Sequence, residues 1–286
     1  PPETLVAHLA GAPAGDRDAA IGELLTHGEA GIAALIATFP GPLTVDRYDH
    51  EQESVPVEQH GPVLRAMIRF GAAAAPGLEG LCDHVSPDVR YYAVLCFAAI
   101  RHPDSLPVLG ARLVDKDTTV REVAARVIDS YRDDAGFDVV VRRARSMLEK
   151  GRLSEKRLAA EALGLLHAAD AAPDLIAGLN APEPPVAEAA HRALIEIARQ
   201  DFGTNVWRWR TWFERNLTRP RVEWLLDGLL SDKRPIRVGA FRELRRLTHL
   251  NYGYTPDAPP PARRAATEKW MAWWHQSGRA KFGHYR

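Results

Sequence analysis

The side chains best suited to bind a metal ion gather in one acidic segment, residues 40–61. It contains Asp49, Glu51 and Glu53 together with two histidines, and carboxylates and imidazoles are common metal ligands. The spacing lacks the D-x-[DN]-x-[DN]-G pattern of a calcium-binding loop. We therefore predict no metal site. The segment is either a solvated loop or a contact with a partner, and Asp49, Glu51 and Glu53 are its candidate binding residues.

Motifs for catalysis are missing from the chain. No G-x-x-x-x-G-K-[ST], G-x-G-x-x-G, G-x-S-x-G or H-E-x-x-H occurs, and no two histidines stand four residues apart. Cys82 and His84 are neighbours, but a nucleophile needs a base that faces it across the fold. Cys82 and Cys96 both fall in helical patterns, where we expect small buried side chains. We predict a non-catalytic protein without a cofactor.

The formal charge is zero, but it is distributed unevenly. Residues 1–60 hold 2 basic and 10 acidic side chains, a net charge of −8, whereas residues 201–286 hold 17 and 8, a net charge of +9. Such polarity can steer a protein partner, or favour head-to-tail contact between copies of the chain. An ordinary drift in surface charge is the alternative interpretation.

Five segments share a small residue followed by an apolar helical stripe, and four of them carry Arg near the start. These second-helix segments are 87–101, 118–132, 154–167, 184–199 and 234–248, with a weaker copy at 16–28. The equivalent apolar position advances by 31, 36, 30 and 50 residues. A period of this size is the sign of a repeated supersecondary unit.

The helices between these segments repeat as well. Segments 75–82, 106–113 and 172–179 each place Pro two residues before an apolar position, with a second apolar residue four positions later. Pro is tolerated in a first helical turn, and apolar residues at i and i+4 make one buried stripe. Units of two antiparallel helices bury their apolar faces by stacking. The sequence predicts an all-α protein, a right-handed α-solenoid without strands.

The pattern resembles HEAT repeats, in which Pro stands near the start of the first helix and D-x-x-V-R-like residues open the second. The best matches are "PDVRYYAV" at 87–94 and "DKDTTVREVAA" at 115–125. The resemblance covers about residues 16–250 and implies a binding scaffold for proteins or a subunit of a larger complex. Armadillo repeats would need a third helix per unit, and tetratricopeptide repeats a stricter 34-residue period, so both fit less well.

Four arginines, Arg90, Arg121, Arg157 and Arg237, open successive second helices. If these helices line one wall of the stack, the arginines form a ladder along it. The ladder is either structural, paired with Asp residues of neighbouring turns such as Asp88 and Asp117, or a row of donors for an acidic or peptide partner.

Two tryptophan-rich segments interrupt or follow the repeats, an insertion at about 200–218 and a capping segment at about 251–286. They resemble each other: "IARQDFG" then "WRTWF" in the first, "LTHLNYG" then "WMAWW" in the second. Such Asp/Asn-aromatic-Gly-then-Trp segments resemble companions of bacterial HEAT-like repeats. We predict that the glycines end helices and that the indoles pack within the fold; an aromatic cage for a ligand is the alternative.

Nucleic acid is the rival partner. All seven tryptophans lie within 207–274 among many arginines, and Arg242 and Arg245 follow on the next helix, so phosphate contacts and base stacking are conceivable. HEAT-like DNA glycosylases cradle DNA, but they are basic along the whole concave face. A HEAT-like tetrapyrrole lyase is a further alternative, for which no motif is present.

We predict one solenoid domain over residues 1–286. No apolar run is long enough to span a bilayer, and the first residues lack the features of a signal peptide. The expected location is cytoplasmic. The chain does not begin with Met, so a truncated or processed N-terminus stays open.

Overall fold

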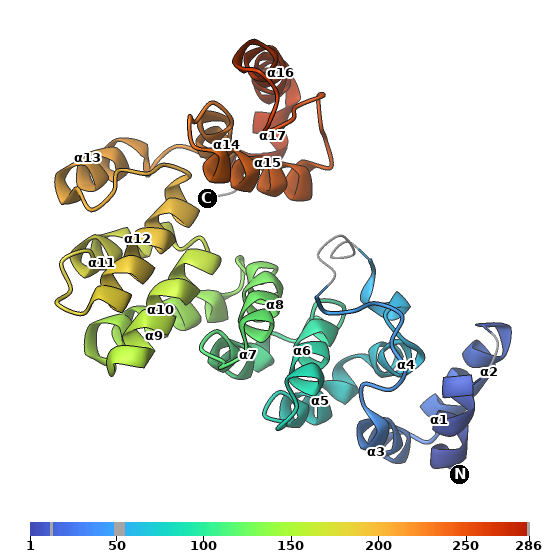
Figure 1. Cartoon of the computed structure of the whole chain (residues 1–286). Coiled ribbons are helices and arrows are strands. Elements are labelled where there is room, and N and C mark those ends of the chain that lie inside the picture. Colours follow the sequence, from blue (N-terminus) through green and yellow to red (C-terminus); the bar gives the residue numbers. More distant parts are fainter. Residues whose placement is uncertain (12–13, 49–54, 285–286) are drawn as a thin grey trace. The chain divides into compact units, whose positions relative to one another are not determined.

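The computed structural model describes residues 1–11, 14–48 and 55–284 (Figure 1). Within these ranges the chain is helical and contains no β-strand, which confirms the predicted all-α class. It divides into two compact units, residues 1–143 and 144–286. The prediction of one domain over the whole chain stays a prediction.

The first unit consists of short helices that pair in the predicted order. They are α1 (Pro2–Gly11), α2 (Ala14–Thr26), α3 (Glu29–Thr38), α4 (Pro62–Arg69), α5 (Ala75–Leu81), α6 (Pro87–Cys96), α7 (Leu106–Arg112), α8 (Thr118–Asp129) and the beginning of α9 (Ala135–Lys150). Helix α5 packs on α6 and α7 on α8, and the second helices α6 and α8 lie against each other. The predicted prolines stand in the first turns of α5 and α7.

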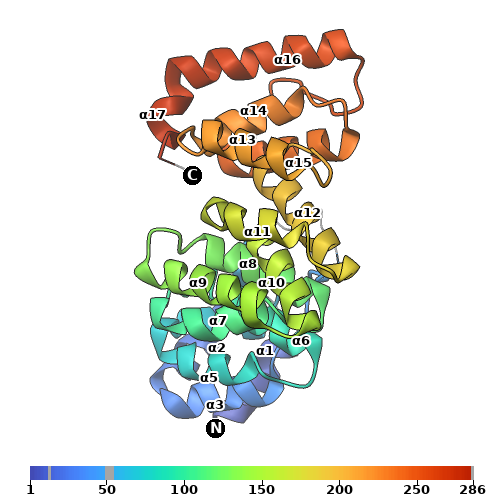
Figure 2. The same ribbon diagram turned by 90° about the vertical axis from the view of Figure 1, so that its left-hand side faces the viewer.

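The second unit continues this arrangement and ends in the tryptophan-rich helices. It contains α10 (Leu153–Leu165), α11 (Ala172–Gly178), α12 (Pro184–Ala198), α13 (Val206–Asn216), α14 (Arg221–Leu229), α15 (Arg234–Thr248), α16 (Pro260–Trp273), a π-helical turn (Trp274–Gly278) and α17 (Arg279–Phe282). Helix α16 packs on α14, which also packs on α15 (Figure 2).

Small side chains let the second helices approach closely. Gly164 on α10 faces Ala193 on α12, and a Cβ atom at Gly164 would lie 2.8 Å from the Ala193 Cα. Ala160 and Ala190, on the same two helices, are also fully buried. The small residues that recur in the repeat pattern therefore set the distance between these helices, because bulkier side chains would force them apart.

The C-terminal tryptophans close the apolar core of the second unit, as predicted. Trp270 and Trp274 are buried on α14 and α15, in a cluster with residues such as Leu225 and Leu244. The indole N–H of Trp274 donates to the Glu223 carboxylate (3.2 Å). These side chains act as core residues and not as an open aromatic cage.

The repeated tryptophan module is also present in three dimensions. Phe202 packs edge-on against Trp209 (4.9 Å between ring centroids), and Tyr252 does the same against Trp270 (5.0 Å). The aromatic residue of each turn thus packs on the helix that follows. Gly203 has the predicted left-handed backbone (φ 60°).

The helices themselves end earlier than these glycines. The left-handed residue that ends α12 is Arg199 (φ 51°), and the one that ends α15 is His249 (φ 58°). Gly203 and Gly253 lie four residues further on, in turns closed by the side chains of Asp201 and Asn251, which accept the glycine N–H groups (2.9 and 2.8 Å). An Asx turn, not a helix end, therefore explains both glycines.

Candidate functional site

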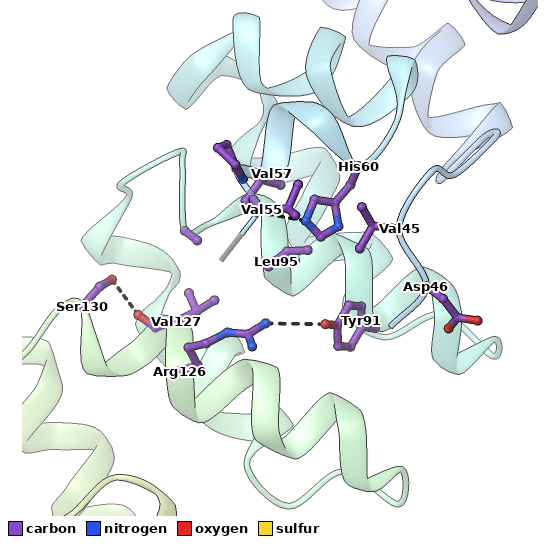
Figure 3. Close-up of a pocket in the computed structure, with 12 residues that line it drawn as sticks. Val45, Asp46, Val55, Val57, His60, Tyr91, Leu95, Arg126, Val127 and Ser130 are labelled. Atoms are coloured by element: carbon purple, nitrogen blue, oxygen red, sulfur yellow. Dashed lines mark hydrogen bonds between the residues drawn. The ribbon is translucent and has the colours of Figure 1, made fainter. Parts of the chain in front are cut away.

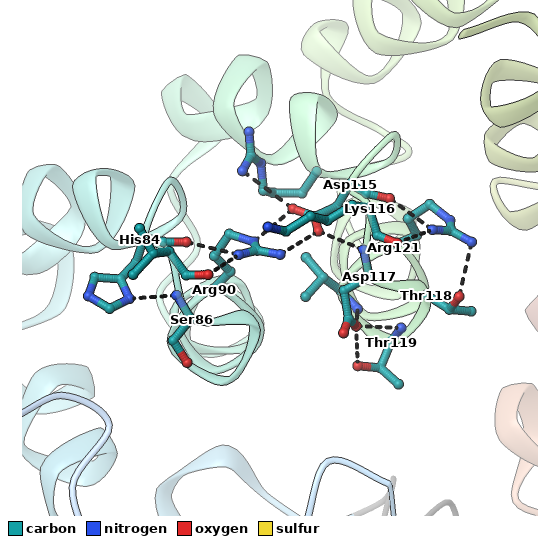
Figure 4. Close-up of polar contacts among 12 residues, drawn as sticks. His84, Ser86, Arg90, Asp115, Lys116, Asp117, Thr118, Thr119 and Arg121 are labelled. Carbon is teal, nitrogen blue, oxygen red and sulfur yellow. Dashed lines mark hydrogen bonds and ion pairs between the residues drawn. The ribbon is translucent and has the colours of Figure 1, made fainter. Parts of the chain in front are cut away.

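Three of the four ladder arginines share one structural contact. The Nη1 group of each donates to the backbone carbonyls five and six residues before it, in the loop that joins the two helices of a pair. For Arg90 these are Val85 (3.1 Å) and His84 (2.9 Å), and Arg121 repeats the contact at 2.8 and 3.3 Å (Figure 4). Arg237 makes the same contact at 2.9 and 2.8 Å. These donors satisfy loop carbonyls that have no helical partner.

Arg90 also forms a buried ion pair. Its Nε and Nη2 atoms lie 2.9 and 2.7 Å from the two carboxylate oxygens of Asp115, and both side chains are 4% exposed (Figure 4). Arg237 is buried too, and its Nε donates to the Pro256 carbonyl (2.9 Å). Arg90 and Arg237 thus make contacts within the fold, with partners other than Asp88 and Asp117. A role of the ladder arginines in binding a partner stays a prediction.

The remaining candidate arginines lie nearer the solvent. Arg157 breaks the pattern: its Nη1 pairs with Glu161 one turn along α10 (2.5 Å). Arg242 and Arg245 are exposed on α15, and the Arg245 guanidinium lies 5.8 Å from the centre of the Phe241 ring. The structure does not bring these three side chains together with the inward-facing arginines.

The acidic segment is anchored by its single basic residue, Arg47, which the sequence analysis did not single out. Its Nε lies 2.7 Å from Asp88, and its Nη1 donates to Asp117 (3.1 Å) and Thr119 (2.7 Å). Asp117 at the same time caps α8 by accepting the Thr119 N–H (3.0 Å). That Arg47 is the single arginine of an acidic loop could have indicated its role as an anchor. The candidate residues Asp49, Glu51 and Glu53 lie outside the described residues.

Next to this anchor the first unit has a pocket with a volume of about 230 Å³ (Figure 3). The loop contributes Val45, Asp46, Val57 and His60, among others. Helix α6 and its C-terminal extension contribute Tyr91, Leu95 and Ala98, and α8 and the residue after it contribute Arg126, Val127 and Ser130. The walls are thus mostly apolar, with a few polar groups, which is typical of a site that receives a small group.

His60 gives the pocket its most specific chemistry. The side chain is buried, and its Nε2 lies 3.1 Å from the Val55 carbonyl oxygen, whereas its Nδ1 has no hydrogen-bond partner among the described residues. A carbonyl only accepts, so Nε2 carries the proton. Burial lowers the pKa of the imidazole, and the Arg126 charge acts in the same direction. The neutral ring therefore has an unpaired acceptor at Nδ1, and this atom is itself enclosed by the surrounding side chains.

Two further polar side chains, Arg126 and Tyr91, line the pocket and lie next to each other. Arg126 lies close to Tyr91, with Nη2 3.5 Å from the phenolic oxygen (Figure 3). Tyr91 stands edge-on against Tyr92, whose hydroxyl donates to the Val45 carbonyl (2.7 Å). The pocket therefore combines a cation and a buried acceptor within apolar walls.

The second unit contains a buried charge cluster that the sequence analysis missed. Glu243 on α15 accepts from Arg221 (2.8 Å to each carboxylate oxygen) and from Arg199 (2.9 and 3.2 Å), while His167 Nε2 lies 3.7 Å away. Burial alone would raise the pKa of Glu243, but the Arg221, His167 and Arg199 charges hold it well below its usual range. The sequence did contain a sign that Glu243 is buried. It lies within the apolar stripe of α15, one turn after Ala240 and one residue before Leu244.

Only one of the seven tryptophans is left in solvent. Trp209, Trp224, Trp270 and Trp274 are buried and two others are partly buried, whereas Trp207 on α13 is 72% exposed. Its neighbours on the exposed side of α13 include Arg210, three positions later, so the two side chains lie on one face. Helix α13 therefore presents one exposed indole beside an exposed arginine.

The two cysteines are free and buried, as expected. Burial raises the pKa of Cys82 to about 12 and the pKa of Cys96 further still, so neither is an activated nucleophile. Over the part of the chain that the structure describes, no cluster of three or more His, Cys, Asp or Glu side chains is arranged to hold a metal ion. None of the described helices is both long and apolar enough to span a membrane.

Residues 75–153 match the family model for HEAT repeats. This range covers α5 to α9, so the helix pairs that include Arg90 and Arg121 are HEAT repeats, as the sequence pattern indicated. No curated protein matches the chain in sequence.

Solved structures with similar helical repeats share little sequence with the chain. One is the complex of CpcE and CpcF of phycocyanin lyase from Nostoc sp. PCC7120 (20% identity, 65% of this chain and 98% of that chain covered, TM-score 0.33). An engineered protein has 19% identity, 87% and 96% coverage and a TM-score of 0.33. A designed armadillo repeat protein for modular peptide recognition has 16% identity, 77% and 94% coverage and a TM-score of 0.31. The HEAT assignment depends on the match over residues 75–153.

Proposed function

We propose that this HEAT-repeat chain is a non-catalytic scaffold that binds other proteins, as a subunit of a larger assembly. The observation that carries the proposal is Trp207, which is 72% exposed while the other tryptophans are wholly or partly buried. An exposed indole loses the stabilisation that burial of such a ring provides, on the order of 2–3 kcal/mol. Tryptophan is among the residues that dominate binding energy at protein interfaces.

The surroundings of Trp207 support a protein partner with acidic groups. Arg208, Arg210 and Arg215 are exposed on α13 beside a single exposed acid, Glu214. The Arg208 guanidinium lies over the Phe202 ring (4.8 Å). Arg210 lies three positions after Trp207, on the same face of α13, and Trp and Arg are both enriched at interface hot spots.

Nucleic acid is the second candidate, because the same arginines could contact phosphates while Trp207 stacks on a base. Three of the other basic side chains of the second unit favour it less. Arg221 and Arg237 are buried, and Arg219 is paired with Glu223 and Asp227. The stacking platform thus consists of one exposed indole.

The experiment places a photo-crosslinking amino acid at position 207 of the full chain in cells of the source organism. Val139 on α9, which is also well exposed (52%), carries the crosslinker in the control. The proposal predicts adducts with defined proteins at 207 only, and binding of the purified partner at low micromolar concentration or better. Adducts with nucleic acid alone would favour the second candidate. A reproducible turnover that one fold-preserving substitution abolishes would contradict a non-catalytic role.

A bacterial origin and a cytoplasmic location are also part of this proposal. The two free cysteines support a reducing compartment, since neither forms a disulfide.

A further inference from the structure

The exposed side of α13 places one indole between arginines. Trp207, Arg208, Arg210 and Arg215 are all exposed, and each residue of a helix turns by about 100°, so their directions around the axis follow from their spacing. Relative to Trp207, Arg210 points about 60° to one side, and Arg208 and Arg215 point about 80–100° to the other. The last two stand seven residues apart and form one row along the helix.

These arginines lack an acidic partner in the described part of their own chain. Arg210 and Arg215 form no ion pair there, and Arg208 only lies over the Phe202 ring (4.8 Å). Trp207 beside them is 72% exposed. The face fits a partner surface that carries carboxylates in rows and has a shallow, uncharged centre, because such a surface neutralises the guanidinium groups and covers the ring.

Helix α2 presents this pattern with the opposite charge. The middle of its exposed side consists of small residues, namely Gly15, Ala19, Gly22 and Thr26. Asp16 and Glu23 stand seven residues apart and form a row about 70–90° to one side of this middle, and Asp18 lies about 70° to the other side. Asp16 and Glu23 form no ion pair with the described residues, whereas Asp18 pairs with Arg65 (2.8 Å).

The two helix faces match when the helices pack antiparallel. This orientation places the arginine row of α13 against the carboxylate row of α2, with Arg208 beside Glu23 and Arg215 beside Asp16. Each row spans seven residues, or about 10.5 Å, so both contacts form at once. The indole then lies over Gly22, where a Cβ atom would meet nothing within 4 Å. Parallel packing would instead bring the arginine row to the side that carries a single, already paired carboxylate.

We propose that α13 of one copy of the chain packs antiparallel on α2 of a second copy, with the indole of Trp207 over Gly22. The net charges of −8 for residues 1–60 and +9 for residues 201–286 favour the same encounter. The inference rests on the proposed function, since it names one protein partner of the scaffold. Because the two surfaces differ, the contact is heterologous and joins copies head to tail.

Sedimentation equilibrium of the full chain at low salt tests the proposal with matched glycine variants. Gly22 and Gly80, on α5, are both exposed helical glycines at which an added Cβ atom meets nothing within 4 Å. Gly22→Gln should obstruct the indole and Trp207→Ala should remove it, and each should raise the dissociation constant about tenfold or more. Gly80→Gln and Leu217→Ala, at an exposed side chain next to α13, should leave it unchanged.

An exchange of charges tests the orientation of the two helices. Glu23→Arg and Arg208→Glu should each weaken association about two- to fivefold, and the chain that carries both changes should regain it, because the pair forms again with reversed signs. Glu122 is an exposed glutamate on α8, away from the proposed contact. Glu122→Arg combined with Arg208→Glu changes the net charge equally and should not restore association.

Mixing two disabled variants separates the two faces. Trp207→Ala keeps its α2 face and Gly22→Gln keeps its α13 face, so their mixture should form a one-to-one heterodimer at a concentration at which each variant alone is monomeric.

Four outcomes would overturn the proposal: a monomeric parent chain at high concentration and low salt, a mixture that stays monomeric, equal effects of Gly22→Gln and Gly80→Gln, or equal rescue by Glu23→Arg and Glu122→Arg. Circular dichroism of each variant checks that it is folded. A monomer that still crosslinks to another protein at position 207 would refute this inference alone and leave the scaffold function standing.

Discussion

Replacing Arg90 with methionine should destabilise the first unit far more than the same change at Arg157 destabilises the second. Arg90→Met leaves the Asp115 carboxylate, 4% exposed, without its bidentate partner, and it frees the carbonyls of His84 and Val85. Removing one member of a buried ion pair costs about 3–5 kcal/mol, and the lower end applies here because Asp115 keeps the Arg112 guanidinium (3.4 Å) and the Asp117 N–H (2.9 Å). Arg157 makes a partly exposed pair with Glu161 one turn along the same helix, which is worth only about 0.5 kcal/mol.

Urea unfolding of the full chain, followed by far-ultraviolet circular dichroism, measures the difference. With an m-value of about 3 kcal/mol per molar urea, Arg90→Met should lower the midpoint of the affected transition by about 1 M or more. Arg157→Met should shift its transition by about 0.2 M or less. Because all seven tryptophans lie within 207–274, fluorescence reports the second unit and helps to assign each transition. Equal shifts of the two midpoints would refute the claim that the buried Arg90 stabilises the fold more than the partly exposed Arg157 does.

Three further changes test other parts of the structure. Gly278→Ala would place a Cβ atom 2.9 Å from the Trp273 ring, so we expect a loss of about 1–3 kcal/mol, visible as a lower midpoint in tryptophan fluorescence; an unchanged midpoint would show that the π-helical turn does not need glycine. Because the fold lowers the pKa of Glu243, its ionised carboxylate stabilises the protein above the ordinary pKa of 4.5, and this stabilisation is lost as the pH falls below that value. In a plot of unfolding free energy against pH, Glu243→Gln should therefore reduce the slope on the acid side. The slope should not vanish, because Asp201 contributes to it as well: hydrogen bonds from Lys233, Gly203 and His191 outweigh burial and lower its pKa to about 2. The buried thiol of Cys82, with its pKa raised to about 12, should react with a thiol reagent at pH 8 only as fast as the chain unfolds, and rapid labelling of the native protein would contradict the burial of α5.

The repeat pattern was sufficient to predict most helices, because it records which faces are buried. Segments 87–101, 118–132 and 234–248 became α6, α8 and α15; α6 ends about five residues and α8 about three residues before the end of its predicted segment, and α15 matches its segment at both ends. The turns were harder to predict. Gly203 has a left-handed backbone, but the left-handed residue that ends α12 is Arg199, whose buried guanidinium is held by Glu243. Such long-range pairing outweighs the local preference for glycine, and a local pattern does not record it.

The candidate site was predictable only in part. The ladder positions were found, but a sequence gives the position of an arginine and not the direction of its guanidinium, so the loop carbonyls it binds were missed. The pocket depends on residues as far apart as Val45, Leu95 and Arg126, which only the fold brings together. The exposure of Trp207 could not be predicted from the sequence either. The same short segment contains Trp209, which is fully buried, and residue type alone does not distinguish the two.

The scaffold proposal is tested most directly with the protein that crosslinks at position 207. Its affinity for the purified chain should be measured for the parent sequence, for Trp207→Ala and for Val139→Ala, with unlabelled oligonucleotide as a competitor. The proposal predicts that Trp207→Ala raises the dissociation constant about tenfold or more, that Val139→Ala leaves it unchanged, and that the oligonucleotide does not compete. Equal affinities for all three chains, or displacement of the partner by the oligonucleotide, would contradict it.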